Sequence, residues 1–236
     1  MATEPLSANR LLAQLSPHDK ARLRPSLQTV NLELKEVLYE PGEPLDYAYF
    51  PISAMLSMIR VMEDGAAIEV ATVGNEGMAE VAALQRQPSA ATRCVVQIPG
   101  AALRMRTEAL KAEVSLDRAF RRLLDQYESL FLKQVYQSVA CNGLHQIQQR
   151  CGRWLLQTHD RCGPEEFPMT HQFMSQMLGV RQASVSGVLR KLAEAGLIPN
   201  WRGKVQILDV AGLELMSCEC YRVVKGEFER AMDGRA

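Results

Sequence analysis

Hydrophobic and polar residues follow a period of two in the first half of the chain. Between residues 30 and 105, apolar residues alternate with polar ones in short runs such as 67–73 and 93–98. Turn signals such as Pro41 followed by Gly42 separate these runs. Alternation of this kind is typical of strands with one buried face, and many short strands between turns favour an antiparallel barrel or roll. A short helical opening precedes the predicted roll.

From Thr107 to Asn142 the apolar residues recur at helical spacing instead. Neither Gly nor Pro interrupts this stretch, so one long helix is predicted. Its apolar stripe either faces a second copy of the chain or packs only on its own roll. Gly143 is expected to break the helix at a hinge, and a further helix is expected from Leu144 to about Asp160. The candidate dimerisation residues are Phe120, Leu124, Tyr127, Phe131 and Val135.

The stretch from Thr170 to Arg190 meets the constraints of a helix-turn-helix. Two short helices that cross steeply need apolar facing sides. Ser175 supplies a small residue at the close approach, and Gly179 stands at the turn, where a left-handed backbone costs a glycine little. An ordinary helical hairpin in a core is the alternative, but the second helix keeps a polar face that a core hairpin would not need. The predicted apolar contacts are Met174, Leu178, Val180, Val185 and Val188.

After the second helix, residues 197–208 predict a β-hairpin with a basic tip at 202–204. A wing of this kind beside a recognition helix can contact phosphates. Residues near the start of the second helix are expected to meet base edges, where Gln182 can pair with adenine and Arg181 with guanine or a phosphate. The candidate DNA-binding residues are Thr170, His171, Arg181, Gln182, Ala183, Ser184, Ser186, Gly187, Arg190, Lys191, Arg202 and Lys204.

Charge supports this interpretation through its distribution. The 236 residues include 27 basic and 27 acidic side chains, so the formal net charge is zero. Residues 1–110 carry 10 Lys and Arg against 13 Asp and Glu, whereas residues 167–205 carry five basic side chains against one acid, Glu194. A local surplus of four positive charges is typical of a surface that binds a polyanion. The predicted recognition unit is therefore also charged as a DNA-binding surface would be.

Composition and missing motifs restrict the class of protein. With 47% apolar and 23% charged residues, the chain has the composition of a soluble folded protein. No apolar run approaches the roughly 20 residues that span a bilayer, and no secretory signal is visible, so a cytoplasmic protein without a membrane partner is expected. No phosphate loop and no catalytic triad stand out, so no enzyme is expected. A regulatory module whose C-terminal unit docks a protein instead of DNA remains the alternative.

The order of these parts resembles the Crp/Fnr family of bacterial transcription regulators. The resemblance spans about residues 10–215 and is most specific from Met169 to Ile198. It implies an α+β fold and a homodimer that reads a near-palindromic operator in double-stranded DNA, with RNA polymerase as a further partner of an activator. The implied domains are an antiparallel, cyclic-nucleotide-binding-like β-roll or jelly roll at 10–106, a long dimerisation helix at 107–142 and a winged helix-turn-helix at 143–217.

Two departures from the family pattern bear on what the chain recognises. The family's cyclic-AMP receptor has Arg, Glu and Arg on its recognition helix where this chain has Gln182, Ala183 and Gly187, so a different operator is expected. Nucleotide-binding members hold the cyclic phosphate with an arginine that directly precedes a serine or alanine, and no arginine precedes Ser89 here. A buried phosphate would lose a bidentate contact, so an unknown effector, or none, is expected. The candidate effector-binding residues are Gly74, Glu76, Gly77, Glu80 and Ser89.

The six cysteines and four histidines match no familiar sensor site. No cysteine precedes Cys94, which disfavours an N-terminal iron–sulfur cluster, and His18 is the sole histidine before the hinge, which disfavours haem. A disulfide between Cys218 and Cys220 is not expected. We therefore expect reduced thiols, no metal and no cofactor. A zinc or redox site can still be drawn near the hinge, although its spacings match no compact zinc signature, from His145, Cys151, His159 and Cys162.

Overall fold

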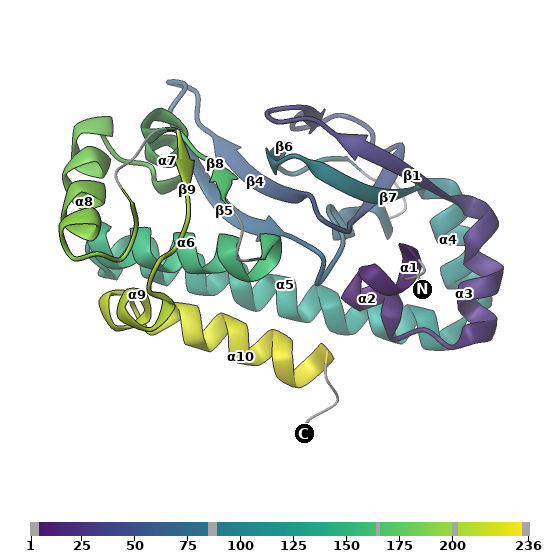
Figure 1. Cartoon of the computed structure of the whole chain (residues 1–236). Coiled ribbons are helices and arrows are strands. Elements are labelled where there is room, and N and C mark those ends of the chain that lie inside the picture. Colours follow the sequence, from purple (N-terminus) through teal and green to yellow (C-terminus); the bar gives the residue numbers. More distant parts are fainter. Residues whose placement is uncertain (1–4, 85–88, 164–165, 200–202, 233–236) are drawn as a thin grey trace. The chain divides into compact units, whose positions relative to one another are not determined.

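The fold is α+β, as the sequence predicts, with strands concentrated before residue 107 and helices after it (Figure 1). Among the residues that the structure describes, no helix combines the length and the apolar character needed to cross a bilayer. The computed structural model describes residues 5–84, 89–163, 166–199 and 203–232.

The described chain divides into two compact units. The first contains the residues up to Met58, Thr72–Leu132 and the chain from Phe228 onward. The second contains Ile59–Ala71 and Lys133–Glu227. The tip of one hairpin from the strand-rich region therefore belongs to the same unit as the helix-turn-helix.

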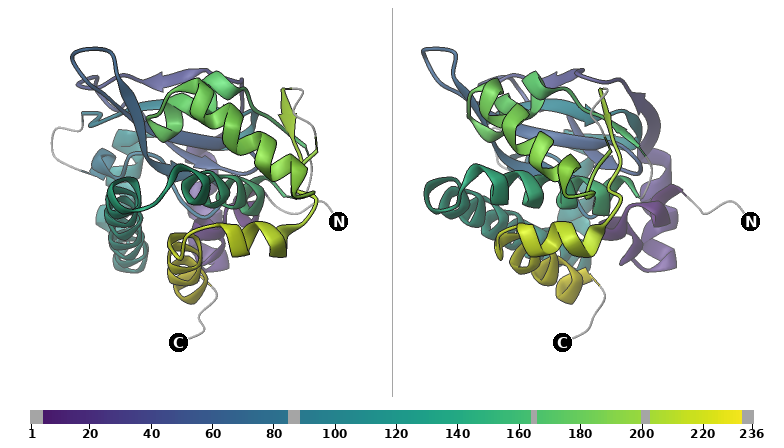
Figure 2. Two further views of the ribbon diagram at one scale, coloured as in Figure 1. Left: turned by 90° about the vertical axis from the view of Figure 1, so that its left-hand side faces the viewer. Right: turned by 60° about the vertical axis from the view of Figure 1, so that its left-hand side comes forward.

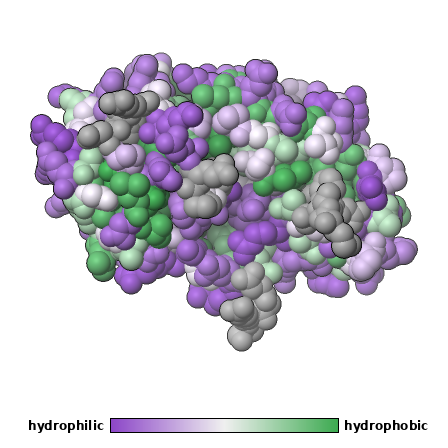
Figure 3. Space-filling model, in the orientation of Figure 1, coloured by the Kyte–Doolittle hydropathy of each residue, from purple (hydrophilic) through white to green (hydrophobic). Residues whose placement is uncertain are grey.

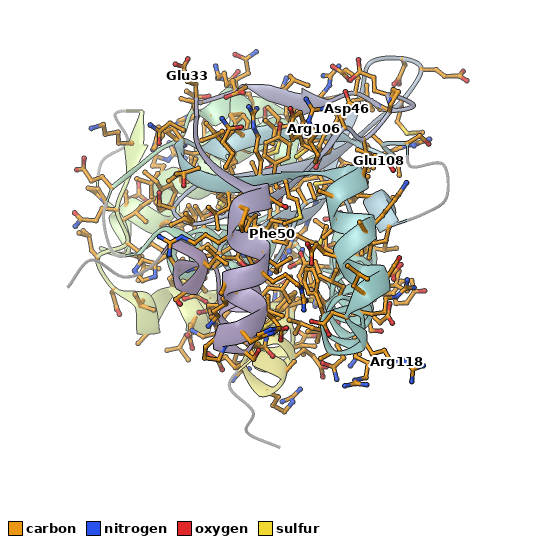
Figure 4. The ribbon with its side chains drawn as sticks, turned by 90° about the vertical axis from the view of Figure 1, so that its right-hand side faces the viewer. Glu33, Asp46, Phe50, Arg106, Glu108 and Arg118 are labelled. Carbon is orange, nitrogen blue, oxygen red and sulfur yellow. The ribbon has the colours of Figure 1, made fainter. Side chains whose placement is uncertain are left out.

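The strand-rich region is the predicted roll. Its strands are β1 (Leu27–Leu32), β2 (Val37–Tyr39), β3 (Tyr47–Pro51), β4 (Met55–Val61), β5 (Ala67–Val73), β6 (Arg93–Ile98) and β7 (Gly100–Arg106). In one sheet β7 lies between β1 and β3 and is antiparallel to both, and the second sheet has the order β2-β6-β4-β5. Consecutive residues of β3, β4 and β6 are buried in the core, where Phe50 is fully buried; Figure 4 shows it in the interior, behind α3 and α4.

The N-terminal helices are tied to the roll by a buried asparagine. Asn9 caps the helix that follows it by accepting the backbone N–H of Leu12, and its Nδ2 donates to the carbonyls of Pro51 and Gly77, both at 2.9 Å. Each polar atom of the Asn9 side chain is therefore satisfied although the residue is completely buried. The helices of this unit are α1 (Pro5–Ala8), α2 (Arg10–Ala13), α3 (Pro17–Leu23), the 3₁₀ turns at Arg24–Ser26 and Val81–Leu84, and α4 (Thr107–Leu116). Helix α5 (Arg118–Leu144) begins in this unit and continues into the second.

The prediction of one helix from 107 to 142 is wrong, because the chain breaks at Asp117. This residue has an extended backbone, with φ −122° and ψ 106°, between α4 and α5. Its carboxylate accepts the N–H of Ala119 and of Phe120 at the start of α5. The same carboxylate receives Arg22 Nη2 at 2.6 Å. A helix start is thus fixed by a contact to a residue far away in sequence.

The predicted break at Gly143 is also wrong. Helix α5 continues through Gly143 and ends at Leu144. A glycine inside a helix costs only about 1 kcal/mol relative to alanine, which the flanking turns can offset. The break between helices therefore lies just beyond, at residues 145–146 between α5 and the next helix.

The second unit is built around helix α6 (Ile147–Cys162), whose Trp154 and Leu155 are buried. Figure 2 shows α7 and α8 side by side, as a helix-turn-helix requires. Helix α10, which the sequence analysis did not predict, follows α9 and ends the described chain. The remaining elements are β8 (Phe167–Pro168), α7 (His171–Leu178), α8 (Gln182–Glu194), β9 (Lys204–Val205), α9 (Val210–Met216) and α10 (Cys220–Met232).

The wing differs from the predicted hairpin in its pairing. Strand β9 pairs antiparallel with β8, so Val205 lies opposite Phe167, which precedes the helix-turn-helix. Residues 197–199 are not a strand, although Leu208 donates its N–H to the carbonyl of Leu197. The pairing follows from burial, because Phe167 and Val205 are each about 1% exposed and stabilise the pair from its inner face.

Candidate nucleic-acid interface

The turn between α7 and α8 has the geometry that the sequence predicts. Thr170 caps α7 by accepting the N–H of Phe173 at 3.1 Å. Gly179 ends α7 in the left-handed region, with φ 62° and ψ 42°. On the facing sides of the two helices, Met174 and Val185 are fully buried. Local capping, one glycine and apolar burial therefore hold α8 against α7.

The start of α8 presents the polar face of this motif. Residues 181–184 are all exposed, whereas Val185 and Val188 behind them are buried. Arg181 occupies the N-cap position with an extended backbone, and its side chain makes no capping hydrogen bond. The backbone N–H groups of a helix N-terminus favour an anionic oxygen such as that of a phosphate. Figure 3 shows a mainly hydrophilic surface along the left-hand edge, where α8 lies.

The basic candidates on α8 and β9 are exposed and weakly paired. Arg190 and Lys191 lie on the solvent side of α8. Arg190 Nε is 3.8 Å from a carboxylate oxygen of Glu194, and Lys204 Nζ is 3.8 Å from one of Glu166. Exposed pairs at such distances contribute little stability, so these cations are available to a phosphate backbone. The candidate Arg202 lies outside the described residues.

Two candidates hold the motif together instead of projecting from it. His171 Nδ1 lies 2.7 Å from Ser186 Oγ, which joins the start of α7 to α8. Ser186 Oγ also donates to the carbonyl of Gln182. His171, Ser186 and Gly187 are each half-buried. These contacts indicate a role in orienting α8 for His171 and Ser186.

The tip of the β4–β5 hairpin contacts the helix-turn-helix, which the sequence analysis missed. Trp154 Nε1 of α6 donates to Glu69 Oε1 at 3.0 Å, and both residues are buried. A Cβ on Gly179 would lie 2.9 Å from Ile68 Cδ1, so the turn glycine also allows this close approach. The isolated Trp154 in an amphipathic helix, with an N–H that needs an acceptor, is the one sequence signal that could have indicated such a contact.

The candidate effector residues that follow β5 are engaged within their own unit. The carboxylate of Glu76 accepts the N–H of Gly74 at 3.1 Å, which closes the turn on itself. Gly77 lies against the ring of Tyr127 so closely that a Cβ would be 2.2 Å from it. Tyr127 Oη donates to the carbonyl of Met78 at 2.9 Å. A helix side chain thus fills the space beside the turn.

Glu80 is the candidate with an unusual environment. It has a left-handed backbone with φ 58°, which is rare for a residue with a side chain. Burial raises the pKa of its carboxyl group to about 7, although a hydrogen bond from Thr92 Oγ1 at 3.2 Å opposes the shift. Ser89 is exposed and forms an isolated bridge with Pro44. Glu80 and Thr92 therefore remain as the polar pair of this region.

The candidate dimerisation residues lie mostly inside their own chain. Phe120, Leu124 and Tyr127 are at most about 1% exposed, so their side chains do not face a second copy. Phe131 and Val135 are half-buried. A different apolar face of α5 is exposed to solvent. It consists of Leu132, Tyr136 and Val139, whose side chains are 45%, 62% and 65% exposed, respectively.

Two separate parts of the sequence match known domain families. Residues 29–116 match the family model of the cyclic nucleotide-binding domain, and residues 149–216 match that of the Crp-like helix-turn-helix domain. The transcriptional regulator SdrP of Thermus thermophilus is 26% identical over 195 residues, which cover 79% of this chain and 93% of that protein.

Several solved structures share the fold of this chain. FixK2 from Bradyrhizobium japonicum has a TM-score of 0.67 at 16% identity, over 81% of this chain and 98% of that one. The global regulator CLP of Xanthomonas campestris, described as responsive to c-di-GMP, has a TM-score of 0.64 at 15% identity, over 82% and 100%. With both domains matched in this order, the chain belongs to the Crp/Fnr family of DNA-binding transcription regulators.

Proposed function

We propose that this regulator binds as a homodimer to a near-palindromic operator and reads each half-site with the N-terminal turn of α8. The observation that carries the proposal is the exposed run from Arg181 to Ser184 on a helix whose opposite side is buried in the motif. Side chains there can reach base edges in the major groove, and the helix N-terminus can receive a phosphate. In this assignment, Arg190, Lys191 and Lys204 contact the phosphate backbone.

Base selection is assigned to Arg181 and Gln182. The arginine suits O6 and N7 of guanine, and the glutamine suits N6 and N7 of adenine, each in bidentate form. Such a pair discriminates against a wrong base by about 1–3 kcal/mol, or about 5- to 150-fold. Because these residue types differ from those of the family's cyclic-AMP receptor, a different half-site is expected.

The test begins with DNA selected from a random pool by the full-length protein. Arg181→Ala combined with Gln182→Ala is expected to reduce affinity for the selected operator to that for unrelated DNA. The control is Arg222→Ala, an exposed arginine on α10 outside the motif. Wild-type affinity should fall steeply as salt increases, because counterions are released on binding. Unchanged sequence preference in the double variant contradicts the assignment, and absent or salt-insensitive binding of the wild type favours a protein partner instead.

The seam of the proposed dimer is the exposed face of α5. Leu132, Tyr136 and Val139 are spaced by four and three residues, which places them on one side of the helix. Large apolar side chains at such exposure are typical of an interaction surface when they share a face. A second copy is the occupant we assign, because a symmetric pair of recognition helices requires one.

The roll is proposed to respond to an effector other than a cyclic nucleotide. Support comes from the turn after β5, where Glu76 closes the turn and the Tyr127 ring occupies the side of Gly77. The Glu80–Thr92 pair is the part of this region we assign to the effector. A neutral hydrogen-bonding group suits this pair better than an anion, because a negative charge beside the Glu80 carboxyl group would disfavour its ionised form.

A further inference from the structure

Four potential metal ligands converge at the C-terminal end of α5. Cys141 lies in the last turn of that helix, and His145 follows one turn later, with its N–H still donating to the carbonyl of Cys141 at 3.1 Å. Cys218 lies in the connection between α9 and α10, and Cys220 is the first residue of α10. The three Sγ atoms and a ring nitrogen of His145 all lie within 4.8 Å of one another. Two segments distant in sequence thus contribute two ligands each.

The spacings inside this cluster suit one tetrahedral ion. Cys141 Sγ and Cys218 Sγ are 3.5 Å apart, and Cys220 Sγ is 3.5 Å from His145 Nδ1. A tetrahedral zinc ion with Zn–S bonds of about 2.3 Å and a Zn–N bond of about 2.0 Å separates two sulfurs by about 3.8 Å and a sulfur from the nitrogen by about 3.5 Å. A disulfide would need sulfurs about 2.05 Å apart, so the cysteines are unlinked.

The surroundings orient the ligands as in a zinc site. His145 directs Nδ1 at Cys220, while its Nε2 lies 3.2 Å from a carboxylate oxygen of Glu219. A carboxylate on the second nitrogen fixes the ring and raises its basicity, an arrangement that accompanies most metal-bound histidines. Gln137 Nε2 donates to Cys220 Sγ at 3.0 Å, which would stabilise a thiolate.

Burial and charge favour a closed site. Cys141, Cys218 and Cys220 are at most about 2% exposed. Arg150 and Arg153 are each about 7% exposed, and within the described ranges neither has a carboxylate partner; their Nε atoms lack any partner. Three thiolates, a neutral imidazole and Zn²⁺ carry a net charge of −1, which would compensate buried guanidinium groups.

We propose that Cys141, His145, Cys218 and Cys220 form a Cys₃His site for a thiophilic divalent cation, with Zn²⁺ as its natural occupant. Four protein ligands leave no open coordination position, so the site is structural. The metal would join the C-terminal end of α5 to the start of α10, within the unit that contains the helix-turn-helix. This inference goes beyond the proposed function and does not depend on DNA binding.

The first experiment uses the wild-type, full-length protein. After purification without chelators, metal analysis is expected to find about one zinc per chain, and a chromophoric chelator should compete for it. Replacement by Co²⁺ should give the visible bands and thiolate charge-transfer absorption of tetrahedral cobalt bound to sulfur. Protein that takes up neither ion after reduction overturns the proposal, and so does a disulfide in place of free thiols in protein prepared under reducing conditions.

Variants then assign the ligands. Cys218→Ser combined with Cys220→Ser should abolish binding of Co²⁺ and Zn²⁺. Cys151→Ala, which removes another buried thiol of the same unit, should leave the stoichiometry unchanged. Glu219→Gln keeps all four ligands and should weaken metal affinity about 10- to 100-fold. Full binding by the double variant contradicts the assignment, and if that variant does not fold, the Glu219→Gln affinity and the cobalt spectrum of the wild type still decide it.

Discussion

At the scale of single residues, Gly77 shows how tightly the turn after β5 packs against α5. Its missing Cβ makes room for the buried Tyr127 ring, which would otherwise lie 2.2 Å from the added atom. Gly77→Ala should therefore lower the free energy of unfolding by about 1–3 kcal/mol through overpacking. Denaturant unfolding of both proteins measures the change.

The matched control for this substitution is Gly143→Ala in α5. Apart from its chain neighbours and the backbone of its own helix, no described atom lies within 4 Å of the position that its Cβ would take. Alanine should therefore raise the free energy of unfolding by about 0.5–1 kcal/mol, because it favours the helix. Equal stability of Gly77→Ala and wild type would mean that the Tyr127 ring moves away without cost, and the turn would then have room for a ligand.

At the scale of elements, the start of α5 depends on Asp117. Its carboxylate caps the helix through two backbone N–H groups and pairs with Arg22, chiefly by a hydrogen bond that lowers the pKa of Asp117 to about 2. Asp117→Ala should cost about 1–2 kcal/mol at neutral pH, as the loss of a helix cap does. Asp125→Ala removes only an exposed pair with Arg121 and should cost about 0.3–0.5 kcal/mol.

The contribution of the Asp117 carboxylate to the free energy of unfolding should decrease as the pH falls. Because folding lowers the pKa of this carboxyl group, its contribution is present above the unfolded pKa of about 4 and disappears as the pH falls toward 2. The stability difference between wild type and Asp117→Ala should accordingly shrink across that window. A difference that stays constant from pH 6 to about pH 2 would show that the carboxylate charge is not what stabilises the helix start.

The sequence predicts an element well when the residues that determine it lie close together along the chain. The helix-turn-helix was predictable because Thr170, Gly179 and the apolar positions around them act within about 20 residues. The break at Asp117 depends on Arg22, 95 residues earlier, and the contact between Trp154 and Glu69 spans 85 residues. Periodicity carries no information on such pairs, so the split helix and the hairpin contact were missed.

The same limit explains why the cysteine cluster was missed. Cys141 and Cys218 are 77 residues apart. Neither the spacing from Cys141 to His145 nor that from Cys218 to Cys220 matches a compact zinc signature. The sequence instead directed attention to Cys151, which the fold places beside Met174 and away from the cluster. Fold topology alone brings the four ligands together.

At the scale of the whole molecule, the proposed dimer determines how the regulator meets its operator. Tyr136→Glu combined with Val139→Glu places charges on the exposed face of α5, so the double variant should be a monomer of about 26.3 kDa in sedimentation equilibrium. The control is Leu215→Glu on α9, where an 89% exposed leucine lies outside that face. It should leave the mass of the wild-type dimer unchanged.

DNA binding tests whether the exposed apolar face of α5 forms the dimer interface. Half-sites read by a symmetric pair of recognition helices should lie about one helical turn apart, at about 10 base pairs between centres. The monomeric variant should keep weak, salt-dependent binding to a single half-site, because α8 is untouched, and should lose the gain in affinity from the second. A double variant that still dimerises, or that binds the full operator as tightly as the wild type, would exclude this face of α5 as the seam.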